Sequence, residues 1–449
     1  MSGLGSGPMI PYSHRERGCK KLEYGCEPQR PISSIRIFVC LMQSQTNPHF
    51  LVRSPLTTAD PSIALAPSLL QRFSRVTSSG EFIPEIDGLR FIAIMAVIFH
   101  HLIAHYLTET QRLGPVNLPA EWYQVYSRSR LVSLLFPGYF GVHLFFVISG
   151  FILALPFARR HFGRASVPAL KRYYLRRLTR MEPPYIINIS LAFACIWFTN
   201  SGHLLFLPHF IASLFYSHGL VYGEASWING VAWSLEIEVQ FYLIVPMLAA
   251  VFAVRDPFQR RALIIGAVIF FGVASQWLIA PSGIKPLKMS VLNYLQYFLA
   301  GFLLVELHLS GWILKRPKTY IWDAAALLFG IAIIIILMRF PKLSCLLPLA
   351  VLLFYASLFR GKLSHAFITL KGVVVLGGMC YTTYLYHTYI ISYLHSAIVY
   401  RFLSPTRSFP LDFLVYVLPQ IIAIFFLSSC VFLWTEKPFM KIRPKVAKP

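Results

Sequence analysis

The chain has 449 residues, of which 56% are hydrophobic and 13% are charged, and its formal net charge is +23. Its mean hydropathy is +0.60, and its charged fraction is about half of that in soluble domains. This composition excludes an ordinary soluble domain and indicates helices that cross lipid. Because the Lys and Arg residues cluster between apolar runs, the positive charge indicates cytoplasmic loops and argues against nucleic-acid binding.

Residues 1–80 differ in composition from the rest of the chain. They are polar, rich in Ser, Pro and Arg, and show no sustained hydrophobic period. The apolar run Ile35–Met42 is too short to span a bilayer. We expect residues 1–80 to be a disordered cytoplasmic extension. Translation that starts later, for example at Met42, would also explain this segment.

Ten apolar runs follow, and each approaches the roughly 20 residues that a helix needs to cross the hydrocarbon core. The sequence therefore predicts an all-α, polytopic membrane bundle of about ten transmembrane helices within residues 81–443. Residues 444–449 would form a short basic cytoplasmic tail. The predicted spans are 88–107, 137–157, 183–200, 231–253, 262–280, 290–309, 321–338, 343–360, 373–400 and 411–434.

The segment 203–222 is an eleventh candidate, and the positive-inside rule tests it. The most basic loop, residues 159–180, should be cytoplasmic. If 203–222 does not cross, the later basic loops and both termini are cytoplasmic as well. We therefore expect 203–222 to be an external interfacial or re-entrant segment. Three histidines in it suit a wet interface better than lipid: His203, His209 and His218.

The first span carries ionisable residues, which are costly in lipid and therefore candidates for function. Arg90 and His101 are eleven residues apart, so they share a helix face and lie roughly 16 Å apart along the axis. His101, in the outer half, is a candidate general base for a hydroxyl proton. His100 would point elsewhere. The structural alternative is a core histidine that bonds to a neighbouring helix.

Glu238 is the acidic candidate, within Trp233–Tyr242 of the fourth span. It would lie roughly 10 Å inside the outer boundary, at about the depth of His101. We expect Glu238 to orient or charge-stabilise the imidazole of His101. The alternative is an unrelated polar residue that the outer loops solvate.

The segment before the third span carries Arg176, Arg177 and Arg180. Membrane topology alone explains most of this charge. Arg177 and Arg180 are nevertheless one turn apart, and such a pair can hold phosphates bidentately. All three arginines are candidates for binding a phosphate-bearing donor.

Further polar residues within the spans are candidates for a substrate path: Asp87, His100, His143, Trp233, Tyr384 and His387. Interhelical hydrogen bonding is the structural alternative for Tyr384 and His387, whereas His143 would otherwise face water. His101 and His105 have the spacing of some zinc ligands, but no acidic or Cys partner accompanies them, and we predict no metal site.

Six motifs in register resemble those of the acyltransferase 3 family of membrane O-acyltransferases, over most of the chain. His143 stands where many members carry Asp. The motifs are Asp87-Gly-Leu-Arg90 with His100-His101, Gly141–Phe151, Arg176-Arg177-x-x-Arg180 with Pro184, Trp233–Tyr242, Tyr384-Leu-Tyr-His387 and Glu436-Lys-Pro-Phe439.

The resemblance implies ten helices in a membrane, most often the bacterial inner (plasma) membrane. It implies acyl-CoA, often acetyl-CoA, as a cytoplasmic donor, with no permanently bound cofactor. The acceptor would be a carbohydrate, a glycolipid or another cell-envelope glycan. Arg177 and Arg180 would hold the donor's phosphates, and Arg90 would organise the donor path. His101 would deprotonate the acceptor hydroxyl or carry the acyl group transiently.

Two other functions remain alternatives. A multi-pass transporter or a flippase for a lipid-linked substrate would have a similar composition, but no convincing repeat relates the two halves of the chain. An inactive relative that acts as an interaction partner is the other alternative, and Arg90, His101 and Glu238 argue against it.

Overall fold

The computed structural model describes residues 73, 82–112, 136–163, 169–199, 202–313, 316–402 and 409–442. The chain divides into a unit of residues 1–65, which lies outside the described residues, and a unit of residues 66–449. Everything below concerns the second unit. The predicted tail and all of the predicted extension except Phe73 lie outside the described residues.

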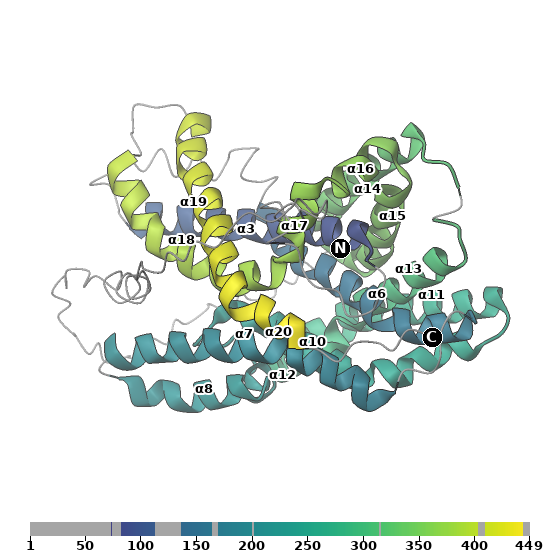
Figure 1. Cartoon of the computed structure of the whole chain (residues 1–449), viewed down its shortest axis with the longest axis horizontal. Coiled ribbons are helices and arrows are strands. Elements are labelled where there is room, and N and C mark those ends of the chain that lie inside the picture. Colours follow the sequence, from purple (N-terminus) through teal and green to yellow (C-terminus); the bar gives the residue numbers. More distant parts are fainter. Residues whose placement is uncertain are drawn as a thin grey trace, which may run out of the picture. The chain divides into compact units, whose positions relative to one another are not determined.

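The described residues form helices and no strand, as predicted for an all-α bundle (Figure 1). The α-helices are α3 (Pro84–Arg112), α6 (Gly141–His161), α7 (Leu170–Thr199), α8 (Leu207–Leu214), α9 (His218–Tyr222), α10 (Trp233–Leu248), α11 (Pro257–Ala274), α12 (Lys285–Lys288), α13 (Leu295–Leu309), α14 (Tyr320–Arg339), α15 (Leu347–Arg360), α16 (Lys362–Ile368), α17 (Lys371–Gly378), α18 (Cys380–Phe402), α19 (Phe409–Val431) and α20 (Lys437–Ile442).

Short helical segments join or extend these helices. The 3₁₀ segments are η2 (Phe136–Phe140), η3 (His203–Phe206), η4 (Gly230–Ala232), η5 (Ala249–Ala253), η7 (Ala280–Ser282), η8 (Val291–Asn293) and η9 (Pro341–Leu346). Two π-helical segments, η6 (Ser275–Ile279) and η10 (Phe432–Glu436), continue α11 and α19.

Eight helical stretches among the described residues are long and apolar enough to cross a membrane. They match eight of the ten predicted spans, so the prediction of a polytopic helical bundle is confirmed. Their bounds are Pro84–Tyr106, Gly138–His161, Leu170–Thr199, Gly230–Ala253, Pro257–Ser282, Tyr320–Arg339, Pro341–Arg360 and Phe413–Met440. The count of ten and the side on which each terminus lies stay predictions.

The other two predicted spans, 290–309 and 373–400, differ from this pattern for separate reasons. The first corresponds to α13, whose 15 residues cover about 22 Å, less than the hydrocarbon core. The second is divided between α17 and α18. Thr382, Thr383 and His387 on α18 are polar but fully buried, whereas Tyr393 is 54% exposed, so α18 carries polar groups into the protein interior and is not a uniformly apolar helix.

Helix α13 is packed directly against α6. An added Cβ at Gly150 would overlap the carbonyl of Phe298, and one at Gly301 would overlap the carbonyl of Val147. Small residues at facing positions let the two backbones approach closely. Gly150 and Gly301 therefore allow α6 and α13 to pack closely, and α13 is almost entirely buried.

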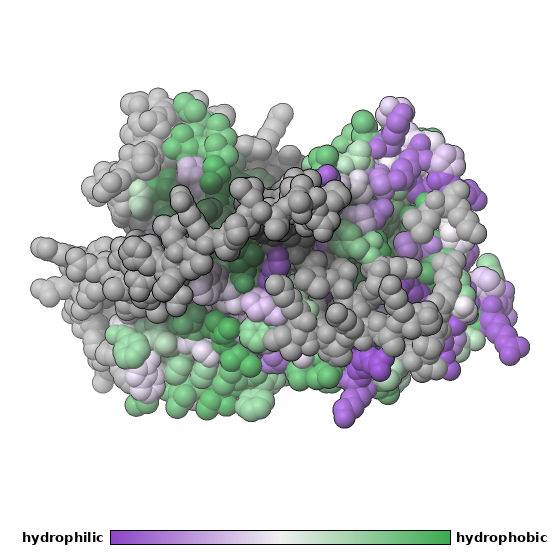
Figure 2. All heavy atoms as spheres, viewed as in Figure 1, coloured by the Kyte–Doolittle hydropathy of each residue, from purple (hydrophilic) through white to green (hydrophobic). Residues whose placement is uncertain are grey.

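Many large hydrophobic side chains face outward on the long helices. Phe198 is 85% exposed, Phe258 79% and Trp434 77%. Figure 2 shows hydrophobic residues in the regions where Figure 1 places α8 and α19, whereas hydrophilic residues gather around α14 and α16. Exposure of apolar side chains on this scale is what a lipid environment requires.

The segment 203–222 is not one continuous helix. It is broken into η3, α8 and α9, and Tyr216 between the two α-helices has a φ of 53°. This break agrees with the prediction that 203–222 does not form a span.

The prediction that histidines of this segment face water is wrong for two of them. His209 is 9% exposed and His218 is fully buried. His209 Nδ1 lies 2.8 Å from His218 Nε2, and burial lowers the pKa of His218. The two rings therefore pack together inside the protein and form a hydrogen bond with each other.

Part of the positive charge between the predicted spans 231–253 and 262–280 is paired with a carboxylate inside the protein. Arg260 is buried on α11 and donates two hydrogen bonds to Glu306 of α13, at 2.7 and 2.8 Å. Arg261 lies 3.3 Å from the same carboxylate. These two arginines therefore join α11 to α13 rather than serving only as topology signals.

Candidate active site

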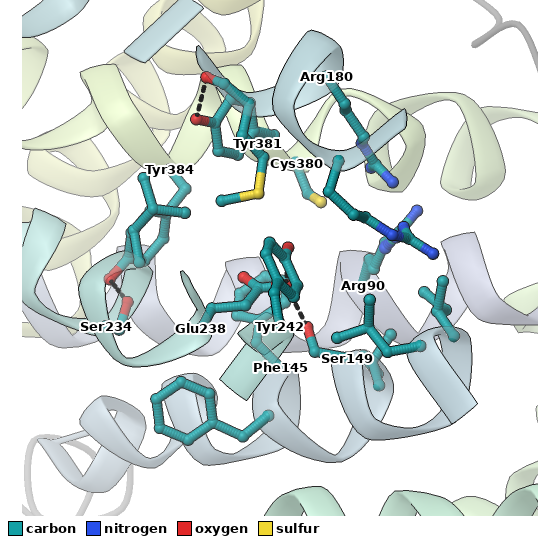
Figure 3. Close-up of a pocket in the computed structure, with 17 residues that line it drawn as sticks. Arg90, Phe145, Ser149, Arg180, Ser234, Glu238, Tyr242, Cys380, Tyr381 and Tyr384 are labelled. Atoms are coloured by element: carbon teal, nitrogen blue, oxygen red, sulfur yellow. Dashed lines mark hydrogen bonds between the residues drawn. The ribbon is translucent and has the colours of Figure 1, made fainter. Parts of the chain in front are cut away.

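The first of two pockets, which we name the arginine pocket, lies among α3, α6, α7, α10 and α18. Figure 3 shows Arg90 and Arg180 on one side of this pocket and Tyr384 on the other. Its polar lining is Arg90, Ser149, Arg177, Arg180, Ser234, Glu238, Tyr242, Cys380, Tyr381 and Tyr384. Five helices that are distant in sequence thus converge on one cavity.

Three guanidinium groups border the arginine pocket. Arg90 is held by Asp87, one turn earlier on α3, through a hydrogen bond of 2.7 Å. Arg177 and Arg180 have no hydrogen bond or ion pair with the other described residues, although the guanidinium of Arg177 lies 5.7 Å from the ring centroid of Tyr173. These three guanidinium groups outnumber Glu238, the one carboxylate in the described lining of this pocket, and an excess of guanidinium groups beside a cavity is suited to an anionic ligand.

Glu238 also borders the arginine pocket, where Ser149 and Tyr242 hold it. Its Oε1 accepts a hydrogen bond of 2.7 Å from Ser149 Oγ and one of 2.6 Å from the hydroxyl of Tyr242. The prediction that Glu238 orients His101 is therefore corrected, because the two side chains border different pockets. Similar depth in two helices does not fix the direction in which each side chain points.

The second pocket, which we name the histidine pocket, is bordered by His100, His101 and His143. Aromatic and uncharged polar side chains make up most of the remaining lining that the structure describes. They are Tyr139, Phe140, Trp233, Ser275, Gln276, Asn293, Tyr294, Gln296, Tyr297, Ser344 and Tyr384.

Helix α3, on which the eleven-residue spacing predicted a shared face for Arg90 and His101, contributes to both pockets. Arg90 borders the arginine pocket and His101 the histidine pocket. His100 also borders the histidine pocket, contrary to the expectation that it points elsewhere. Its ring lies 5.2 Å from that of His101 and 5.7 Å from that of Tyr139. The histidine pocket extends beyond one face of α3, so the side chains of both His100 and His101 border it.

Tyr384 borders both pockets. Its hydroxyl donates to the carbonyl of Val231 at 2.7 Å, so Ser234 Oγ, 2.6 Å away, donates to the Tyr384 oxygen. The neighbouring Trp233 borders the histidine pocket and Ser234 the arginine pocket. The predicted path residues Trp233 and Tyr384 therefore lie where the two pockets meet.

His143 is enclosed by aromatic rings within the histidine pocket. Its ring is stacked on Phe140 with centroids 4.8 Å apart, and it lies 4.7 Å from Tyr297 and 5.7 Å from Tyr294. An imidazole fits such surroundings with less loss of hydration than a carboxylate. His143 stands where many members of the acyltransferase 3 family carry Asp, and in this chain aromatic rings surround that position.

Three predicted site residues border neither pocket: Arg176, Asp87 and His387. Asp87 acts on the arginine pocket indirectly, by holding Arg90. His387 is fully buried, and its Nε2 lies 3.2 Å from His101 Nδ1. The donor-binding role of Arg176 stays a prediction.

Sequence reasoning missed several residues that border the pockets. Ser149 was not among the predicted site residues, although it donates a hydrogen bond to Glu238. Gln296 is 4% exposed, and its Oε1 has no partner among the described residues. Polar residues in a strongly apolar run, as Gln296 is within α13, were the available signal.

Comparisons with known proteins agree with the motifs. A family model described as an acyltransferase domain matches residues 83–434. A predicted O-acetyltransferase of Staphylococcus aureus strain COL is 23% identical over 357 residues, which cover 70% of this chain and 52% of the relative. This chain thus spans about half the length of that relative.

Two relatives with more specific names match a shorter part. The peptidoglycan O-acetyltransferase OatA of Listeria monocytogenes is 27% identical over 201 residues, 42% of this chain and 28% of the relative. The O-acetyltransferase OatA of S. aureus strain NCTC 8325 is 27% identical over 180 residues, 38% of this chain and 25% of the relative. No solved structure matches at the same level of significance.

The family match covers most of the described helices, and eight of their stretches are apolar enough to cross a membrane. The chain is therefore an integral membrane protein that belongs to the acyltransferase domain family.

Proposed function

We propose that this protein is a membrane O-acetyltransferase, which moves an acetyl group from acetyl-CoA to a hydroxyl group of a carbohydrate in the cell envelope. The names of the relatives support O-acetylation. The observation that carries the proposal for this chain is the pair of pockets that meet at Tyr384, one bordered by three arginines and the other by His100 and His101.

The arginine pocket is the proposed donor site. CoA carries several phosphate groups, and Arg177 and Arg180 border the pocket without a direct ion pair to a described carboxylate. Guanidinium groups bind phosphate oxygens in bidentate fashion. If the N-terminus of α3 lies on the cytoplasmic side, the donor enters from the compartment that contains CoA, and its thioester reaches toward Tyr384.

The histidine pocket is the proposed acceptor site. Its lining combines aromatic rings with the amides and hydroxyls of Gln276, Asn293 and Ser275. Sugars present apolar C–H faces that pack on aromatic rings, and hydroxyl groups that bond to amides. A pocket with mostly apolar walls and a few polar groups is typical of a small-molecule site.

The chemistry proposed for His101 is general-base catalysis. Its imidazole takes the proton of the acceptor hydroxyl while the acceptor oxygen attacks the thioester carbonyl carbon. The new C–O bond forms, the C–S bond breaks, and the proton passes from His101 to the CoA thiolate. Transient acetylation of His101 itself is the covalent variant of the same exchange.

Release of CoA thiol from acetyl-CoA tests this proposal in purified protein supplied with an acceptor glycan. We expect turnover by the wild type and a loss of about 100-fold or more in His101→Ala, because general-base catalysis contributes about 10²–10⁴. Equal turnover by both proteins would remove His101 from the mechanism. Failure of the wild type with every glycan supplied would count against acetyl transfer.

Alkylation of Cys380 tests the donor site without relying on turnover. Cys380 borders the arginine pocket, whereas the free thiol of Cys430 on α19 borders neither pocket. Acetyl-CoA should slow alkylation of Cys380 and leave Cys430 unchanged, as quantified by mass spectrometry. Equal rates at Cys380 with and without the donor would place the donor elsewhere.

A further inference from the structure

The ring of His387 on α18 lies against that of His101 on α3. Their centroids are 4.9 Å apart at an interplanar angle of 67°, and His387 Nε2 lies 3.2 Å from His101 Nδ1. His387 is fully buried and borders neither pocket. His387 can therefore act on a substrate only through a neighbour that borders a pocket, and His101 is the neighbour whose ring it contacts most closely.

The partners of His387 determine which of its nitrogens carries a proton. His387 Nδ1 lies 2.8 Å from the carbonyl oxygen of Tyr384. A carbonyl can only accept a hydrogen bond, so Nδ1 carries the proton. In a neutral ring the other nitrogen, Nε2, then presents its lone pair to His101.

The partners of His101 determine its tautomer in the same way. His101 Nδ1 lies 3.0 Å from the carbonyl oxygen of Val97 as well as near His387 Nε2. Both partners are acceptors, so His101 Nδ1 carries a proton that they share. His101 Nε2 is consequently unprotonated, which is the state that a base requires.

We propose that His387 is a positioning residue for His101, a role that rests on the proposed function. It holds His101 in the tautomer whose Nε2 is free, and it stabilises the imidazolium that forms when Nε2 takes the acceptor's proton. His387 itself neither gains nor loses a proton. In the Ser-His-Asp triad a buried carboxylate has this role, whereas here a neutral imidazole has it.

Neither the carbonyl of Val97 nor the carboxylate of Glu238 can replace His387. The carbonyl of Val97 is on the same helix as His101, so it cannot connect the ring to another part of the structure. Glu238 is held by Ser149 and Tyr242 in the arginine pocket. His387 alone among these groups connects His101 to α18, whose Tyr384 borders both pockets.

Nitrogen NMR of protein labelled with ¹⁵N in its histidine rings, in nanodiscs, tests the hydrogen bond directly. Signals of His101 and His387 are assigned by their loss in His101→Gln and His387→Gln. We expect the Nδ1–H tautomer for both rings and a scalar coupling from His101 Nδ1 to His387 Nε2 across the hydrogen bond. An Nε2–H tautomer at His101, or rings without coupling, would overturn the proposal.

Two substitutions separate the hydrogen bond from the mere presence of a polar side chain. In His387→Gln the amide reaches the position of Nε2, and in His387→Asn it reaches only that of Nδ1. We expect kcat within about fivefold of wild type for Gln and a loss of about 100-fold for Asn, with an unchanged KM for acetyl-CoA. Equal losses in both variants, or a change in KM alone, would contradict the role.

The two measurements also separate this proposal from the proposed function. If the wild type transfers no acetyl group but the coupling is present, acetyl transfer fails and the hydrogen bond between the rings stands. If turnover is normal and the coupling is absent, only the role of His387 fails. Protection of Cys380 by acetyl-CoA confirms that each variant is folded around the donor pocket.

Discussion

At the scale of single residues, helix α3 contributes Arg90 to the arginine pocket and His101 to the histidine pocket. That both lie on one helix followed from their eleven-residue spacing, because helix geometry is local. The partner of Glu238 was predicted wrongly, since it depends on how α10 is rotated against α6. The bond from Ser149 to Glu238 joins residues 89 positions apart, and no local pattern encodes it.

The arginine pocket leads to a prediction about Arg177. In Arg177→Gln the KM for acetyl-CoA should rise about 10- to 100-fold with a smaller change in kcat, because a charge-assisted bond to a phosphate is worth about 1.5–3 kcal/mol. Arg172→Gln, which removes an exposed charge from the same helix, is the matched control. Steady-state kinetics with varied donor would contradict the donor site if both variants behaved alike.

At the scale of helices, the apolar runs predicted where most helices lie but not how each one is surrounded. Helix α18 is missing from the apolar spans because it contains many Tyr, Thr and His residues, which lower its hydropathy. Thr382, Thr383 and His387 are fully buried, so these polar groups meet other helices rather than lipid. The breaks within 203–222 agree with the positive-inside rule, which predicted that this segment does not cross the membrane. Composition did not predict that His209 and His218 in this segment are buried.

Close packing of α6 against α13 leads to a prediction about stability. In Gly150→Ala the added Cβ meets the backbone of Phe298, so α6 must move and the melting temperature in detergent should fall. Gly266→Ala is the matched control, because a Cβ at Gly266 on α11 meets nothing within 4 Å. Its stability should stay the same or rise slightly, since Ala favours a helix by about 1 kcal/mol over Gly. A lower melting temperature for Gly266→Ala than for Gly150→Ala would contradict the packing.

At the scale of the whole molecule, the proposed function predicts that the two pockets open toward opposite sides of the membrane. Charge bias predicts that the loop with Lys285 lies outside and the loop with Lys362 inside. Both side chains are exposed, so each position accepts a probe without disturbing a core.

Cysteine labelling tests this arrangement in a cysteine-free background. A membrane-impermeant maleimide should label Lys285→Cys in intact cells, and Lys362→Cys only after the membrane is permeabilised. Labelling of both positions from the same side would mean that the number of crossings between them differs from the prediction, and the donor and acceptor sides would then need to be reassigned.

We propose that the arginine and histidine pockets are two halves of one site for acetyl transfer. The most direct measurement supplies protein in nanodiscs with acetyl-CoA that is ¹³C-labelled at the acetyl carbonyl, together with cell-envelope glycans, and follows formation of a labelled ester by mass spectrometry. We predict a labelled glycan ester with the wild type and about 10²–10⁴ less with His101→Gln. Movement of a glycan across proteoliposome membranes without any labelled ester, or equal ester formation by both proteins, would contradict the account.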